Sequence, residues 1–108
     1  MSCRILVVDD TPLVCDQLKQ LLELEGYEVE TAPSGRIALE MLHAQTFDLL
    51  ITDLRMDDMG GFELLRAVRT ERLPFGVVLL TGHGDTQIAL DAMKAGADDF
   101  ITKPCEPE

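Results

Sequence analysis

Short apolar runs alternate with amphipathic stretches along the whole chain. The run at residues 5–8 is Ile-Leu-Val-Val, with no polar position, as in a strand buried on both faces. Val14, Leu18 and Leu22 then recur at helical spacing. The same alternation continues to the end of the sequence. We expect strands at residues 4–9, 28–32, 47–52, 74–80 and 99–102, with one amphipathic helix between each strand and the next.

Residues with strong preferences for helix ends separate these elements. Thr11 and Ser34 are predicted N-caps, and Pro12 suits the first turn of a helix. Gly26 suits the left-handed position that commonly ends a helix. The strand at residues 28–32 is more polar than the others, so we place it at an edge of the sheet.

The alternation of strands and helices predicts an α/β fold, a doubly wound five-stranded parallel sheet with helices on both faces. The crossovers between strands are expected to be right-handed. The 108 residues are enough for one domain, residues 1–108. In open sheets of this kind, ligands bind beyond the carboxyl ends of the strands.

The side chains best suited to chemistry lie at those carboxyl ends. They are Asp9, Asp10, Asp53, Thr81 and Lys103. In the strand order 2-1-3-4-5, the first and third strands are neighbours about 4.8 Å apart, so the three carboxylates converge. Taken singly, an aspartate at a strand end is most often a turn former and a lysine is most often solvated. The set as a whole favours a functional site.

Three carboxylates this close stay ionised only if a cation joins them; otherwise protonation removes part of the charge. Oxygen ligands in a shallow site suit Mg²⁺, with Asp10 binding directly and Asp9 directly or through water. Lys103 adds a second positive charge and Thr81 a hydroxyl donor, which together suit a phosphoryl group. Asp53 stands alone on the central strand and is the predicted nucleophile, which would form an aspartyl phosphate.

Composition narrows the classes of partner. Twenty acidic and nine basic residues give a net charge of −11, which argues against direct binding of nucleic acid by this chain. No apolar run approaches the roughly 20 residues of a membrane span, and the N-terminal residues do not resemble a signal peptide. Cys3, Cys15 and Cys105 show no metal-binding spacing and are predicted to be free thiols in a reducing compartment. We therefore expect a cytoplasmic protein.

Five stretches connect the sequence to a known family. They are RILVVDD, FDLLITDLRM, GGFELL, VVLLTGHGD and MKAGADDFITKP, and they are distributed from Arg4 to Pro104, over essentially the whole chain. The sequence closely resembles the receiver domain of bacterial two-component response regulators, with a flavodoxin-like fold. It is most similar to receivers of the nitrogen-regulation type, which precede transcription-activator modules. The strand order used above is one that receiver proteins exemplify, so it is not independent of this resemblance.

The resemblance implies that Asp53 accepts a phosphoryl group from a phosphohistidine on a sensor histidine kinase. It implies Mg²⁺ as cofactor, bound by Asp10, Asp53 and the backbone carbonyl of Arg55, with Asp9 assisting. Thr81 and Lys103 would then contact phosphoryl oxygens.

Further expectations rest on the same resemblance. Phe100 occupies the position of an aromatic switch residue, and the bond before Pro104 is expected to be cis. The family allows homodimers, and an output module that acts on transcription would follow in the full-length protein. Asp57 and Asp58 depart from the family, which usually has Pro at the first of these positions. The family's fifth helix is expected to be missing, which would make this a C-terminally truncated receiver.

Three other classes compete with a phosphoacceptor signalling module. A Mg²⁺-dependent aspartyl-phosphate hydrolase needs a substrate pocket or cap, and no loop here is long enough to build one. A flavodoxin-like cofactor binder needs a Ser/Thr-rich phosphate loop, which the sequence lacks. A degenerate receiver that only binds partners would not need the complete set of three acids, threonine and lysine. We therefore expect a signalling module in a phosphorelay and not an enzyme.

Overall fold

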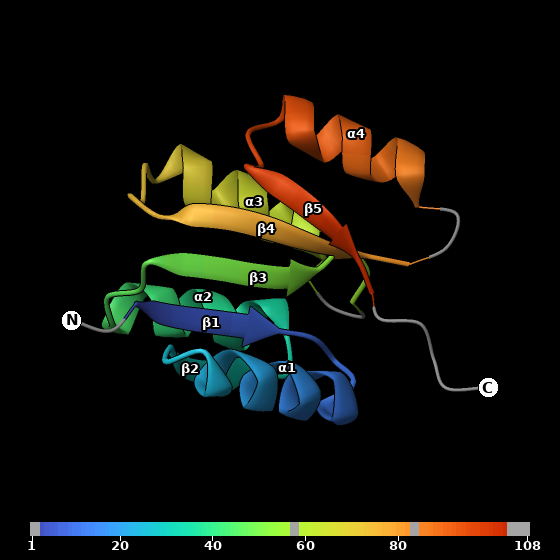
Figure 1. Cartoon of the computed structure of the whole chain (residues 1–108). Helices are drawn as coiled ribbons and strands as arrows, with labels where there is room; N and C mark the ends of the chain where they lie inside the picture. The colour runs from blue at the N-terminus through green and yellow to red at the C-terminus, as the bar shows by residue number, and fades with distance from the viewer. Residues whose placement is uncertain (1–2, 57–58, 83–84, 104–108) are drawn as a thin grey trace.

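The computed structural model describes residues 3–56, 59–82 and 85–103. A five-stranded parallel sheet in the order β2-β1-β3-β4-β5 carries helices on both faces (Figure 1). The strands are β1 (Arg4–Val8), β2 (Glu28–Ala32), β3 (Leu49–Asp53), β4 (Gly76–Thr81) and β5 (Asp99–Thr102). The helices are α1 (Pro12–Leu24), α2 (Gly35–Ala44), α3 (Gly61–Thr70) and α4 (Thr86–Lys94). The predicted fold class and strand order are confirmed.

The bounds of three strands differ from the sequence-based expectation. β1 ends at Val8, one residue earlier than expected, and β4 ends at Thr81, one residue later. β4 begins at Gly76 and not at residue 74, because Pro74 has no N–H to donate and the N–H of Phe75 bonds locally to Leu73. β3 begins at Leu49 and extends to Asp53, which pairs with Leu80 of β4. β3 therefore carries its terminal carboxylate within the sheet itself.

Helix ends follow the predicted signals in three of four places. Pro12 is the first residue of α1, as expected. The hydroxyl of Ser34 accepts the N–H of Ile37 and so caps α2, as expected. Gly26 has a φ of +94° after α1, also as expected. Thr11 precedes α1, but its side chain makes no capping hydrogen bond. Its backbone N–H instead donates to Oδ1 of Asp9, at 2.9 Å.

Two apolar clusters lie on opposite faces of the sheet. The larger one joins β-strand side chains to α2, α3 and α4, and includes Leu50, Leu65 and Ala92. The smaller one lies under α1 and includes Cys15 and Leu18. Among the described helices, only α1 contributes to this second cluster. Ile101 of β5 is 43% exposed. Within the residues described, no helix is both long and apolar enough to cross a membrane.

The first helical residue of α3 packs directly against the end of β3. A Cβ added at Gly61 would overlap the backbone oxygen of Asp53, and backbone atoms cannot move aside cheaply. This close approach fixes the position at which Asp53 leaves the sheet.

Replacement of Gly61 by alanine is therefore expected to lower the free energy of unfolding by about 1–3 kcal/mol, the usual cost of overpacking, although alanine favours helix. Urea unfolding measures the change. Gly82→Ala serves as the control, because its Cβ would come no closer than 3.6 Å to a neighbour, Oδ2 of Asp85. Equal losses in the two variants would contradict the packing argument.

Candidate functional site

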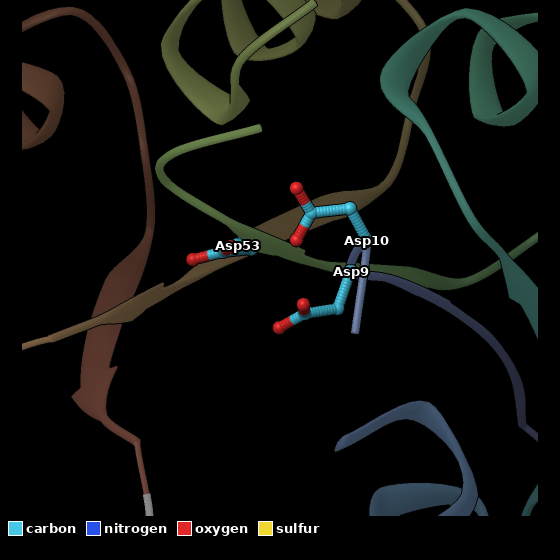
Figure 2. A group of neighbouring side chains, drawn as sticks. All are labelled: Asp9, Asp10 and Asp53. Carbon is cyan, nitrogen blue, oxygen red and sulfur yellow. The ribbon is translucent and has the colours of Figure 1, made fainter. Parts of the chain in front are cut away.

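Three carboxylates meet at the carboxyl edge of the sheet. Asp9 and Asp10 follow β1, Asp53 ends β3, and the two strands are paired neighbours. One oxygen from each carboxylate lies within 4.8 Å of the other two (Figure 2). Asp9 and Asp53 are buried and Asp10 is exposed. The predicted convergence of the three acids is confirmed.

Lys103 reaches this group from the end of β5. Its Nζ lies 3.1 Å from Oδ2 of Asp9 and 3.2 Å from Oδ2 of Asp53. The backbone N–H of Lys103 donates to the carbonyl of Thr81 at 2.7 Å, which anchors the start of the side chain beside β4. One ammonium therefore lies between the two buried carboxylates.

The carboxylates at the site carry more negative charge than the nearby lysine can neutralise. Oδ2 of Asp9 is fully buried and accepts no well-aligned hydrogen bond, although the Lys103 ammonium lies close to it. Two buried carboxylates and the exposed Asp10 thus share one nearby lysine. An electron-rich oxygen without a hydrogen bond, in a group of carboxylates, fits a hard divalent cation such as Mg²⁺.

Burial and like charge perturb the carboxylate of Asp53. Desolvation raises the pKa of Asp53, and the negative charge of Asp9 raises it further. Lys103 and a backbone hydrogen bond from Arg55 oppose these effects without cancelling them. Burial lowers the pKa of Lys103, but its contacts with Asp9 and Asp53 outweigh burial, so the net pKa is raised.

The pKa of Asp53 has a consequence for stability. The folded state holds this proton more tightly than the unfolded chain does. The free energy of unfolding should therefore fall as pH rises from the ordinary carboxyl value of 3.8 through the raised pKa, and then level off. Lys103 acts in the same direction at higher pH: its contribution to the free energy of unfolding is present below 10.5 and is lost as pH rises through its raised pKa.

In chelator, Asp53→Asn should therefore gain stability over the wild type as pH rises above about 4, with the gain levelling off above the raised pKa of Asp53. Urea unfolding at a series of pH values measures the difference. Asp16→Asn, at an exposed position of α1, is the control for loss of one negative charge. A pH-independent difference between the wild type and Asp53→Asn would contradict the raised pKa.

The other predicted residues lie around the same edge. Thr81 ends β4, is buried, and donates from Oγ1 to the carbonyl of Ile101 at 3.3 Å. Phe100 is half-buried on β5, opposite Leu79, and packs against the larger apolar cluster. The predicted cis bond before Pro104 lies outside the described residues, as do Asp57 and Asp58.

One buried residue at this edge was missed by the sequence reasoning. Asp85 precedes α4, is 6% exposed, and forms an ion pair with the side chain of Arg55. The sequence signal was the last letter of TGHGD, which indicates a helix cap. The structure shows a different role, because the Asp85 side chain makes no capping hydrogen bond to α4. Its Oδ2 accepts the N–H of Gly82.

The fold and the acidic site together define the class of response regulator receiver domains. Residues 5–108 match the model of that family, and the chain belongs to it. It is 41% identical over 105 residues to the alginate biosynthesis transcriptional regulatory protein AlgB of Pseudomonas aeruginosa, covering 97% of this chain and 23% of the relative. It is 36% identical to the transcriptional regulatory protein FixJ of Bradyrhizobium diazoefficiens, covering 97% of this chain and 51% of the relative.

Solved structures agree with the family. The chain superposes on FixJ-N with a TM-score of 0.89 at 39% identity, covering 98% of this chain and 85% of that one. The chain superposes on the Vibrio cholerae chemotaxis protein CheY4 with a TM-score of 0.90 at 32% identity, and the match covers 99% of this chain and 91% of that one. The predicted kinship with receivers of transcription regulators is thus confirmed. The chain spans between about a quarter and a half of the length of these two curated relatives.

Proposed function

We propose that this domain is a phosphoacceptor module that takes a phosphoryl group onto Asp53 in a Mg²⁺-dependent reaction. The observation that carries the proposal is the group of Asp9, Asp10 and Asp53 around the ammonium of Lys103. Aspartates that only form turns at strand ends do not need a lysine among them. A site that binds phosphoryl oxygens needs positive charge, because the phosphoryl group brings negative charge.

Asp53 is the proposed nucleophile. Its carboxylate oxygen forms the new bond to phosphorus as the bond to the donor nitrogen of a phosphohistidine breaks, and that nitrogen leaves with the electron pair. Lys103 already lies 3.2 Å from Asp53 and can neutralise a phosphoryl oxygen without a large movement. Asp10, Asp53 and the backbone carbonyl of Arg55 would hold Mg²⁺, with Asp9 assisting, and the ion would neutralise further oxygens.

We propose that the side chains of Thr81 and Phe100 move in response to phosphorylation. The hydroxyl of Thr81 now donates to a carbonyl of β5 and can rotate to donate to a phosphoryl oxygen instead. The space that Thr81 leaves would let Phe100 move inward. Such a response is a shift in population between two packings of the same residues.

The proposed partners follow from the family. A sensor histidine kinase supplies the phosphoryl group, and an output module elsewhere in the full-length protein acts on transcription. Homodimers of the domain are part of the same proposal. We also propose that the domain extends over residues 1–108.

The test is incubation of this chain with acetyl phosphate and Mg²⁺, followed by intact-protein mass spectrometry. We expect an increase equal to one phosphoryl group, lost when a chelator replaces Mg²⁺ and mapped to Asp53. Release of free phosphate from many unrelated monoesters at high turnover would instead indicate a hydrolase. A chain that stays unmodified under these conditions would overturn the proposed function.

A further inference from the structure

Arg55 and Asp85 connect two loops at the edge of the site. Nε of Arg55 donates to Oδ1 of Asp85 at 2.8 Å. The Arg55 side chain is 68% exposed, but that of Asp85 is only 9% exposed. Ion pairs between two exposed side chains contribute little to the free energy of unfolding. Here one partner is a buried carboxylate, so loss of the guanidinium leaves that charge poorly compensated.

Asp85 in turn holds the end of β4 and the start of α4. Its Oδ2 accepts the N–H of Gly82 at 3.2 Å, and Gly82 directly follows Thr81. Its backbone carbonyl accepts the N–H of Ala89 at 2.9 Å, a bond of the first turn of α4. A displacement of the Asp85 carboxylate would therefore move the first turn of α4.

Arg55 also contacts the acceptor. A hydrogen bond from its backbone reaches the carboxylate of Asp53 and stabilises the charged form. An unbroken series of direct contacts thus runs from Asp53 through Arg55 to Asp85 and α4. This series uses neither the hydroxyl of Thr81, which bonds to β5, nor the ring of Phe100.

We propose that the Arg55–Asp85 ion pair couples the state of Asp53 to the first turn of α4, in parallel with the route through Thr81 and Phe100. The inference rests on the proposed function of Asp53. A phosphoryl group adds negative charge beside the Arg55 loop, which attracts the guanidinium and repels the Asp85 carboxylate. The pair then loosens, and α4 is released from the position that Asp85 holds.

The experiment follows amide NMR shifts of residues 86–89 on addition of excess acetyl phosphate and Mg²⁺, with the phosphorylated fraction measured by mass. Arg55→Gln and Asp85→Asn are each expected to reduce the phosphorylation-induced shifts about twofold or more. The double variant should show no further reduction, because both changes break one coupling. Arg55→Lys keeps the charge and should retain more of the shift than Arg55→Gln. Arg66→Gln, at an exposed position of α3, is the matched control and should respond like the wild type.

The outcomes separate the two proposals. A wild-type chain that accepts no phosphoryl group overturns the function and the coupling together. Phosphorylated variants with shifts of wild-type size, or a double variant with additive losses, overturn the coupling alone. An Arg55→Gln chain that folds but cannot be phosphorylated also overturns it, because the Arg55 side chain would then be needed for phosphorylation itself.

Discussion

Asp53→Asn is expected to abolish phosphorylation of this domain completely while its fold is kept. The two side chains are nearly isosteric, so the packing at the end of β3 is unchanged and only the nucleophilic oxygen is lost. The neutral amide also removes a buried charge beside Asp9, which burial and repulsion both disfavour. The variant should therefore melt no lower than the wild type in chelator at neutral pH. Intact mass after incubation with acetyl phosphate and Mg²⁺ measures the first effect, and thermal melting measures the second.

The control for this prediction is Asp16→Asn, which removes one exposed carboxylate of α1. That variant should be phosphorylated like the wild type. Mg²⁺-dependent labelling of another residue in Asp53→Asn would show that Asp53 is not the acceptor. A large loss of stability would show that its charge is needed for folding, against the raised pKa.

The second large effect is expected for Lys103→Met. Methionine keeps much of the apolar stem but removes the ammonium that lies between Asp9 and Asp53. The side chains of these acids are 0% and 7% exposed, so their charges would be left buried and uncompensated. Breaking a buried pair in this way costs about 3–5 kcal/mol; since Lys103 is itself 28% exposed, we expect about 3 kcal/mol. That is a large share of the roughly 5–15 kcal/mol of a small domain.

Urea unfolding in chelator measures the loss. Addition of Mg²⁺ should restore part of it, because a bound cation compensates the same carboxylates. Adding Asp9→Asn to Lys103→Met should also recover stability, since it removes one of the unpaired charges. Lys94→Met, at the exposed end of α4, is the control and should cost no more than about 1 kcal/mol. Equal losses in the two lysine variants would refute the charge argument.

Much of the fold follows from local pattern. The apolar run at residues 5–8 fixed a strand buried on both faces, and the helical spacing after it fixed α1. Ser34 and Gly26 marked helix ends because their preferences are intrinsic to one residue. Position in the sequence also placed Asp9, Asp10 and Asp53 at strand ends. The parallel sheet then had to bring them to one edge.

Other features depend on contacts between distant segments. Pro74 lies within an apolar run, yet β4 starts after it, because the missing N–H matters only once a neighbouring strand is present. At this position, the local preference for a strand was outweighed by pairing that the sequence pattern does not reveal.

By itself, the sequence determined the order of elements, the acidic edge and the residue types available for phosphoryl chemistry, since these depend on periodicity and on residues close together in the chain. Only the tertiary structure decided which charges share the ammonium of Lys103, and that Asp85 is buried against Arg55, 30 positions away. The physical reason is that burial and charge balance depend on distances in space. A carboxylate before a helix predicts only a helix cap, and the fold alone brings the guanidinium of Arg55 to Asp85.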